Sequence, residues 1–223
     1  LFRSQINDVD TFLDEAENRI FTIAETKLRQ GFFNLGGLVE SEIALLEKLY
    51  GRREMTTGVA THFRDLDRYT AGLQNSDLII LAARPGMGKT AFARNIARHA
   101  ALQADVPAVV FSLEMSKEQL SMRMLSSEAR LDSTRLRSGF ISQDDWMKIT
   151  EAAGNLSNAP IFIDDSPVLT AMEIRAKARR LKLDKNIGLI IIDYLQLMQG
   201  RRSAERRDLE ISEISRAMKA LAK

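Results

Sequence analysis

A glycine-rich turn that ends in a lysine and a threonine carries the strongest chemical signal in the sequence. This turn, Arg84–Thr90, follows an apolar run and precedes a helical pattern, which is the strand–loop–helix context of a Walker A phosphate-binding loop. Gly86 and Gly88 let the backbone amides approach a phosphate closely. We expect Lys89 to reach the β- and γ-phosphates of a nucleotide and the Thr90 hydroxyl to hold Mg²⁺. The alternative is a glycine-rich turn with an incidental lysine, which the flanking strand and helix disfavour.

A Mg²⁺ ion at such a loop also needs a carboxylate at the end of a neighbouring buried strand, and two strands offer one. Leu189–Asp193 has four consecutive strand-forming residues before its acid, so we predict that Asp193 holds the metal. Ile161–Asp165 is the rival, but a Ser-Pro pair follows at once and favours a turn there. We expect the two acids of this rival segment to cap the helix that begins near Thr170.

Hydrolysis of a bound nucleotide also needs a group that orients and polarises the attacking water. Glu114 comes directly after the apolar run Ala108–Leu113, at the edge where parallel sheets bind their ligands. We therefore predict that Glu114 is the catalytic base and that Lys89, through the phosphates, is the second catalytic residue. The alternative is that Glu114 caps the helix that follows.

Apolar strands alternate with amphipathic helices from Phe63 onward, which indicates a parallel sheet covered by helices on both faces. The expected strands are Asp77–Ala83, Ala108–Leu113, Ile161–Ile163 and Leu189–Ile192. The expected helices are Thr90–Ala104, Lys117–Arg130, Asp144–Asn155, Ala171–Leu181 and Asp208–Lys223. The sequence therefore predicts an α/β fold with a parallel central sheet.

The first 61 residues have a different pattern, that of a helical region followed by a linker. Residues 8–30 carry apolar side chains at three-and-four spacing, so we expect a helix of about 20 residues there. A turn-like break (Phe32–Gly37), a second helix (Val39–Tyr50) and a polar linker (Gly51–Thr61) follow. Nothing nearby in the sequence covers the apolar face of the first helix, which therefore folds back on its own domain or docks on a partner. We place the domain boundary after residue 61, with the α/β domain over 62–223.

Composition excludes several classes of protein. Hydrophobic residues make up 45% and charged residues 28%, which is ordinary for a globular chain and excludes a disordered or collagen-like one. The chain has no cysteine, so disulfides and cysteine-based zinc sites are excluded, and His62 and His99 are far apart in the sequence. The longest apolar run, Leu78–Ala83, is far shorter than the ~20 residues of a membrane span. We expect a soluble, cytoplasmic protein that does not bind membranes.

Positive charge is concentrated near the C-terminal end. Residues 175–223 hold 13 Lys/Arg against 6 Asp/Glu, although the net charge of the whole chain is only +2. A basic stretch on a near-neutral chain is typical of proteins with a polyanionic partner. On composition alone, a solvated helix face is an equally good interpretation.

Five segments in combination resemble the replicative DNA helicases of the bacterial DnaB family. They are Ala82–Thr90, Phe111–Ser116, Ile192–Met198, Glu210–Arg216 and Leu13–Glu17, and the similarity runs through essentially the whole chain. Ala83 stands where the general phosphate-loop pattern has its first glycine, and members of this family commonly have a small residue there. The resemblance implies a RecA-like ATPase fold, a homo-hexameric ring, and ATP-driven 5′→3′ translocation on single-stranded DNA.

The resemblance also assigns cofactors, site residues and partners. It implies ATP and Mg²⁺ as cofactors and the roles given above for Lys89, Thr90, Asp193 and Glu114. Nucleotide contacts carry over to Gly86, Gly88, Ala91 and, less directly, Arg123. The helix expected at 8–30 corresponds to a linker that packs on the ATPase domain of the adjacent subunit, and a helicase loader and primase are the implied protein partners.

In a ring of this kind, the segment that follows the Asp193 strand can face the central channel. This segment is Gly200–Arg207, and four arginines lie in it: Arg201, Arg202, Arg206 and Arg207. We predict that they make sequence-independent contacts with DNA phosphates, since the segment has no aromatic residue on which bases could stack. A solvated loop is the alternative.

Some features of the family are expected outside the sequence. Its N-terminal domain would precede Leu1, and its sensor glutamine, main DNA-binding loop and arginine finger would follow Lys223. Because an arginine finger raises turnover by about 10³–10⁵, we expect the 223-residue chain alone to bind ATP and Mg²⁺ but to hydrolyse ATP weakly. Two competing interpretations are a recombinase-like or clock-type P-loop ATPase and a non-catalytic fragment that docks through residues 8–30.

Overall fold

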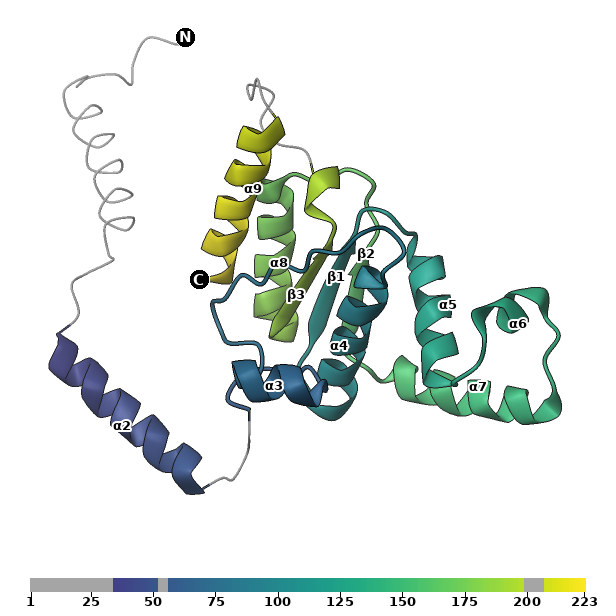
Figure 1. Ribbon diagram of the computed structural model, residues 1–223, viewed down its shortest axis with the longest axis horizontal. Coiled ribbons are helices and arrows are strands. Elements are labelled where there is room, and N and C mark those ends of the chain that lie inside the picture. The colour runs from purple at the N-terminus through teal and green to yellow at the C-terminus, as the bar shows by residue number, and fades with distance from the viewer. Residues whose placement is uncertain (1–33, 52–55, 199–206) are drawn as a thin grey trace, which may run out of the picture. The chain divides into compact units, whose positions relative to one another are not determined.

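The computed structural model describes residues 34–51, 56–198 and 207–223 (Figure 1). The chain divides into two compact units, Leu1–Arg53 and Glu54–Lys223. The helix expected at residues 8–30 lies outside the described residues.

In the first unit, helix α2 (Leu35–Gly51) exposes a stripe of apolar side chains. It begins after Asn34, whose side-chain oxygen accepts a hydrogen bond from the Gly36 amide at 2.8 Å. The turn-like break expected to extend to Gly37 is therefore wrong at its C-terminal end, because Gly36 and Gly37 already belong to the first turn of the helix. The exposed apolar side chains recur at helical spacing and are Leu35, Leu38, Val39, Ile43, Leu46 and Tyr50.

The second unit is built on a parallel three-stranded sheet in the order β2-β1-β3. The strands are β1 (Ala108–Ser112), β2 (Ile161–Asp164) and β3 (Leu189–Asp193). Its helical elements among the described residues are α3 (Arg64–Thr70), α4 (Lys89–Gln103), α5 (Lys117–Glu128), α6 (Ser133–Ser138), α7 (Gln143–Ser157), α8 (Ala171–Lys185), the 3-10 helix η1 (Leu195–Leu197) and α9 (Arg207–Ala222). The predicted parallel α/β fold is confirmed.

The register of the sheet brings two acid-ended strands to the same edge. Phe111 of β1 lies opposite Asp164 of β2, and Ser112 of β1 lies opposite Asp193 of β3. Because all three strands are parallel, their carboxyl ends form one edge. Asp164 and Asp193 are therefore at the same edge but on opposite sides of β1.

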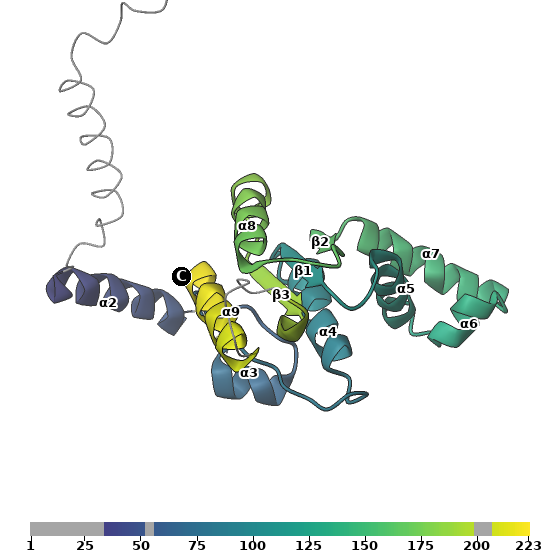
Figure 2. The same cartoon turned by 90° about the horizontal axis from the view of Figure 1, so that it is seen from above.

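Helices cover both faces of the sheet, because alternate residues of the central strand point to opposite sides. Val109 and Phe111 belong to a buried cluster with residues of α8 and α9. Ala108 and Val110 belong to a second cluster with residues of α4 and α5. Figure 2 shows α8 and α4 on opposite sides of the strands.

The expected helices after residue 89 are confirmed to within a few residues as α4, α5, α7, α8 and α9, while α3, α6 and η1 were not expected. Helices α5, α6 and α7 share a small separate core around Ala129, Ile149 and Ala152. Around that core, Phe140, Trp146 and Met147 have exposed side chains. No helix in the described part of the chain is long and apolar enough to cross a membrane.

The strand expected at Asp77–Ala83 is wrong. These residues have no regular secondary structure and form no ladder with any strand among the described residues. Ile79, Ile80 and Leu81 are 56%, 59% and 42% exposed. An apolar run becomes a strand only where another strand offers hydrogen-bonding groups, which the run itself cannot supply. The residue just before this segment is nevertheless fixed to α9, because the Lys219 ammonium on α9 donates a hydrogen bond to the Ser76 carbonyl at 2.9 Å.

Candidate functional site

The glycine-rich turn is an exposed loop that leads directly into α4. The Met87 amide donates to the Arg84 carbonyl at 3.2 Å, which closes the turn. Gly86 and Gly88 have φ angles of 79° and 87°, a left-handed conformation that residues with a Cβ rarely adopt. Gly88 is the N-cap of α4, and no side chain of the described residues caps the helix there. The first amides of α4 are therefore free to bind an anion.

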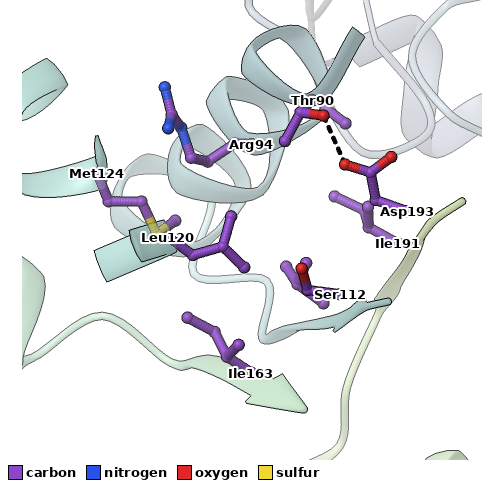
Figure 3. Close-up of a pocket in the computed structure, with 10 residues that line it drawn as sticks. Thr90, Arg94, Ser112, Leu120, Met124, Ile163, Ile191 and Asp193 are labelled. Atoms are coloured by element: carbon purple, nitrogen blue, oxygen red, sulfur yellow. Dashed lines mark hydrogen bonds between the residues drawn. The ribbon is translucent and has the colours of Figure 1, made fainter. Parts of the chain in front are cut away.

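Asp193, the last residue of β3, contacts the first two residues of α4 (Figure 3). The Thr90 hydroxyl donates to the Asp193 carboxylate at 2.6 Å, and the Lys89 ammonium lies 3.5 Å from the other carboxylate oxygen. Asp193 is 7% exposed, so its charge is largely removed from water and depends on these two partners. The structure thus brings together three residues of the predicted site.

Tyr194, which the sequence analysis did not single out, also contacts this group. The Lys89 ammonium lies 4.3 Å from the centre of the Tyr194 ring, within the range of a cation–π interaction. Lys89 is therefore held between a carboxylate and an aromatic face. The position of Tyr194 directly after the acid was the signal that could have identified it.

The oxygen atoms of Asp193 and Thr90 fit a Mg²⁺ ion that is held mainly by a nucleotide and water. Mg²⁺ prefers oxygen ligands and keeps several waters, so one carboxylate and one hydroxyl from the protein are a sufficient contribution. Among the residues that the structure describes, no group of three or more His, Cys, Asp or Glu side chains forms a metal cage. The site therefore suits a metal that arrives with phosphate oxygens rather than one bound by the protein alone.

Glu114 lies just beyond the carboxyl end of β1 and is exposed. A tight turn holds the chain there, because the Ser112 hydroxyl donates to the Met115 carbonyl at 2.7 Å. Glu114 does not cap α5, since the cap is Ser116, whose hydroxyl accepts a hydrogen bond from the Gln119 amide. The carboxylate of Glu114 is therefore not used by the helix that follows it.

The acids after β2 are engaged with other partners. Asp164 accepts hydrogen bonds from the Lys177 ammonium at 2.6 Å and from the Ser166 hydroxyl at 2.6 Å. Burial disfavours ionisation of Asp164, but these hydrogen bonds outweigh burial and hold the pKa of its carboxyl below the ordinary value. Asp165 accepts from the Lys117 amide at 3.1 Å, and this bond lowers the pKa of its carboxyl.

The prediction that these two acids cap the helix near Thr170 is therefore wrong. Thr170 is itself the N-cap of α8 and forms a capping box with Glu173. Asp165 instead accepts a hydrogen bond from the amide of Lys117, the first residue of α5. Lys117 is distant from Asp165 in the sequence but lies next to it at the edge of the sheet.

The remaining predicted residues are placed as follows. Ala91 lies in the first turn of α4, and Arg123 is exposed on α5. Arg207 begins α9 and donates to the Glu210 carboxylate and to the Gln196 carbonyl, so it joins α9 to η1. The other three predicted DNA-contacting residues lie outside the described part of the chain: Arg201, Arg202 and Arg206.

His62 and His99, which are far apart in the sequence, stack on each other with ring centroids 3.8 Å apart. Asp67 accepts the His62 backbone amide at 2.9 Å, which fixes the segment before α3. Burial, followed by the nearby charges of His62 and Arg98, lowers the pKa of His99. The pair packs the segment around His62 onto α4, and no pattern in the sequence indicated this contact.

Comparison with known proteins finds one matching family model and several similar proteins. Residues 58–223 match the family described as DnaB-like helicase C-terminal domain. The chain is 48% identical over 218 residues to the replicative DNA helicase DnaB of Geobacillus stearothermophilus, and 47% identical over 218 residues to the replicative DNA helicase DnaC of Bacillus subtilis (strain 168). Each of these matches covers 97% of this chain and 48% of the relative, so the chain spans about half the length of the curated relatives it matches.

Two solved structures share the fold. One is a solved ATPase domain that superposes with a TM-score of 0.76 at 32% identity, over 83% of this chain and 66% of that one. The other, a DnaB-like replicative helicase whose structure was described together with its interactions with primase, superposes with a TM-score of 0.74 at 31% identity, over 82% of this chain and 44% of that one. The parallel α/β core is thus that of RecA-like helicase ATPase domains.

Proposed function

Because this chain belongs to the DnaB-like helicase C-terminal domain family, we propose that it is the motor part of a replicative DNA helicase. In this proposal, a hexameric ring uses ATP hydrolysis to move 5′→3′ along single-stranded DNA in the cytoplasm and to unwind the duplex ahead of it. The observation that carries the proposal is the contact of Asp193 with both Thr90 and Lys89 at the start of α4. The name shared by the relatives, replicative DNA helicase, supports the reaction.

The nucleotide site proposed here uses the loop and the first turn of α4. The backbone amides around Gly86 and Gly88 bind phosphate oxygens, with Ala91 in the same turn. Lys89 exchanges its contact with Asp193 for a phosphate, while Asp193 and Thr90 contribute oxygen ligands to Mg²⁺. The metal supplies positive charge that neutralises the phosphates.

Glu114 acts in this proposal as the base that orients and deprotonates the attacking water. Its carboxylate lies past the end of β1, the strand next to β3, so it approaches the same edge of the sheet as Asp193. Because Ser116 caps α5, Glu114 is free for this task. Arg123, on the helix that follows Glu114, adds a nucleotide contact.

Assembly into the ring is proposed to use the helical region 1–61, which docks on the ATPase domain, 62–223, of a neighbouring subunit. The residues proposed for the linker contact, 8–30, lie outside the described part of the chain, but α2 next to them exposes an apolar stripe. In the ATPase domain, Phe140, Trp146 and Met147 are also exposed. Apolar surfaces of this kind are typical of protein–protein contacts.

DNA and protein partners complete the proposal. Arg201, Arg202, Arg206 and Arg207 contribute salt-sensitive contacts with the phosphates of single-stranded DNA. A primase is a proposed partner because one structural relative was described with primase, and a helicase loader is proposed from family resemblance alone.

The experiment that tests this function is unwinding of forked DNA by the complete protein, with substrates that carry either a 5′ or a 3′ loading tail. ATP-dependent unwinding that requires the 5′ tail is expected, and Lys89→Ala abolishes it because the phosphate contact is lost. Unwinding that is independent of ATP, or an active Lys89→Ala variant, contradicts the proposal. A recombinase-like ATPase binds the same DNA without unwinding it.

A further inference from the structure

Ser112 is a buried polar residue beside the nucleotide site, and the function proposed above does not use it. It ends β1, lies opposite Asp193 in the register of the sheet and is 3% exposed. It lines the same small cavity as Thr90 and Asp193 (Figure 3). The other residues of β1 are apolar, and a buried hydroxyl is costly unless it is hydrogen-bonded. The partners of this hydroxyl therefore indicate what it does.

Both hydrogen bonds of the Ser112 hydroxyl are made with one residue, Met115. The hydroxyl donates to the Met115 carbonyl at 2.7 Å, and the Met115 amide donates to the hydroxyl oxygen at 3.3 Å. One side chain thus holds both backbone groups of a residue three positions later, which closes the turn Ser112–Met115. Glu114 lies inside this turn and is exposed.

The residues on either side of Glu114 are fixed to the sheet and its core. The Leu113 amide donates to the Asp193 carbonyl at 2.8 Å, and Leu113 is buried in the core. Met115 is half-buried and packs against the cluster on the opposite face of the sheet. The backbone before Glu114 is therefore held by a hydrogen bond to β3, and the backbone after it is held by Ser112.

The position of the Glu114 carboxylate depends on this backbone. Its side chain makes no hydrogen bond or ion pair with another described residue, so no neighbouring side chain orients it. A general base must lie within hydrogen-bond distance of the group from which it takes a proton. A displacement of about 1 Å can lower a rate about a hundredfold. Because Leu113 is bonded to Asp193, the turn also sets where the base lies relative to the residue proposed to hold Mg²⁺.

We propose that Ser112 is a positioning residue for ATP hydrolysis: its hydroxyl fixes the turn that carries Glu114 and so holds the base in place beside Asp193. The inference rests on the proposed function, in which Glu114 is the base. Ser112 itself touches neither the nucleotide nor the metal. It acts on the reaction only through the backbone of the turn.

The test measures steady-state ATP hydrolysis by the complete protein in wild type and Ser112→Ala. Alanine removes the hydroxyl but keeps the phosphate loop, Thr90 and Asp193. The kcat should fall about tenfold to a hundredfold because the base is no longer held in place. The KM and the affinity for a non-hydrolysable ATP analogue with Mg²⁺ should change less than about twofold. An unchanged kcat, or a loss of affinity as large as the loss of kcat, overturns the inference.

Ser126→Ala is a matched control for the loss of a buried hydroxyl. Ser126 is 7% exposed, and its hydroxyl donates to the Leu131 carbonyl at 2.6 Å, beside the separate core of α5, α6 and α7. Both substitutions should lower the Tm, because each leaves a backbone carbonyl without its hydrogen bond. The kcat of Ser126→Ala should nevertheless stay within about twofold of wild type. A similar loss of kcat in the two variants assigns the effect of Ser112→Ala to stability and overturns the inference.

A double-mutant cycle with Glu114→Gln tests whether Ser112 acts through the base. In the Glu114→Gln background, Ser112→Ala should lower kcat less than about twofold further, because no base remains to be positioned. A further loss as large as that in wild type shows that Ser112 acts elsewhere and overturns the inference. Failure of the proposed function gives a different result, since Glu114→Gln then hydrolyses ATP as wild type does.

Discussion

Strands β2 and β3 end in nearly the same way, yet their acids have different surroundings. Each strand places isoleucines before an aspartate at the carboxyl edge, and each aspartate contacts one lysine and one hydroxyl. Asp193 contacts Lys89 and Thr90. Asp164 contacts Lys177 and a serine.

The difference lies in where the partners come from. Lys89 and Thr90 begin a helix whose amides are uncapped and whose preceding loop is exposed, so a ligand can replace the contact between Lys89 and Asp193. Lys177 lies in the middle of α8, and Asp164 accepts a hydrogen bond from Ser166 in the turn that follows it. These contacts are all made within the protein, and the neighbouring helices α5 and α8 both have capped starts. A strand-end aspartate is therefore a candidate metal ligand only when its neighbours also offer a site for the rest of the ligand.

The largest expected effect comes from exchanging the two carboxylates for amides. In the complete protein, Asp193→Asn should lower ATP turnover by about a hundredfold or more, because it removes a charged ligand at the site where phosphate charge develops. Asp164→Asn, the matched control, should change turnover by less than about threefold, since it lies on the other side of β1 with its own partners. Steady-state ATP hydrolysis checks both values, and equal losses in the two variants contradict the distinction.

The second effect concerns stability and its dependence on pH. At neutral pH, Asp164→Asn should lower the free energy of unfolding by about 1–2 kcal/mol, a modest value because Lys177 is 42% exposed. The hydrogen bonds of Asp164 hold its pKa in the folded protein below the ordinary 3.8. Its stabilisation is therefore present above about pH 4 and is lost as the pH falls through the folded value.

Urea unfolding of wild type and Asp164→Asn from about pH 7 to pH 2 measures this contribution. The difference in unfolding free energy between the two proteins should shrink as the solution becomes more acidic. A difference that stays constant over this range contradicts the ion pair between Asp164 and Lys177.

The smallest effect concerns Tyr194, whose aromatic ring contacts the Lys89 ammonium beside Asp193. Tyr194→Leu should weaken binding of an ATP analogue by about two- to fivefold, because the ring no longer orients the Lys89 ammonium. Tyr194→Phe keeps the ring and should bind as wild type does. Equal affinities for the Leu and Phe variants show that the ring does not contribute.

The local sequence was sufficient to predict structure where a residue's conformation depends on its neighbours in the chain. The glycines of the loop and the apolar strands β1 and β3 follow from such patterns. The sequence assigned Asp193 and Thr90 to one metal site, and the structure brings these two side chains into contact, although the run before the loop is not a strand of the sheet.

Contacts between distant segments were not predictable in the same way. The apolar run that contains Ile79 and Ile80 has the sequence of a buried strand, but no strand among the described residues pairs with it. Asp165 was assigned to the wrong helix because its partner, Lys117, lies across the sheet edge. The stacking of His62 on His99 joins two segments that have no common pattern.

The central claim is that Asp193, and not Asp164, serves a metal-bound nucleotide at the start of α4. Its most direct test is the affinity of this chain for a fluorescent ATP analogue with and without Mg²⁺, measured in wild type, Asp193→Asn and Asp164→Asn. The account predicts that Mg²⁺ strengthens binding to wild type and to Asp164→Asn but not to Asp193→Asn. Mg²⁺-dependent binding that survives in Asp193→Asn and disappears in Asp164→Asn contradicts it.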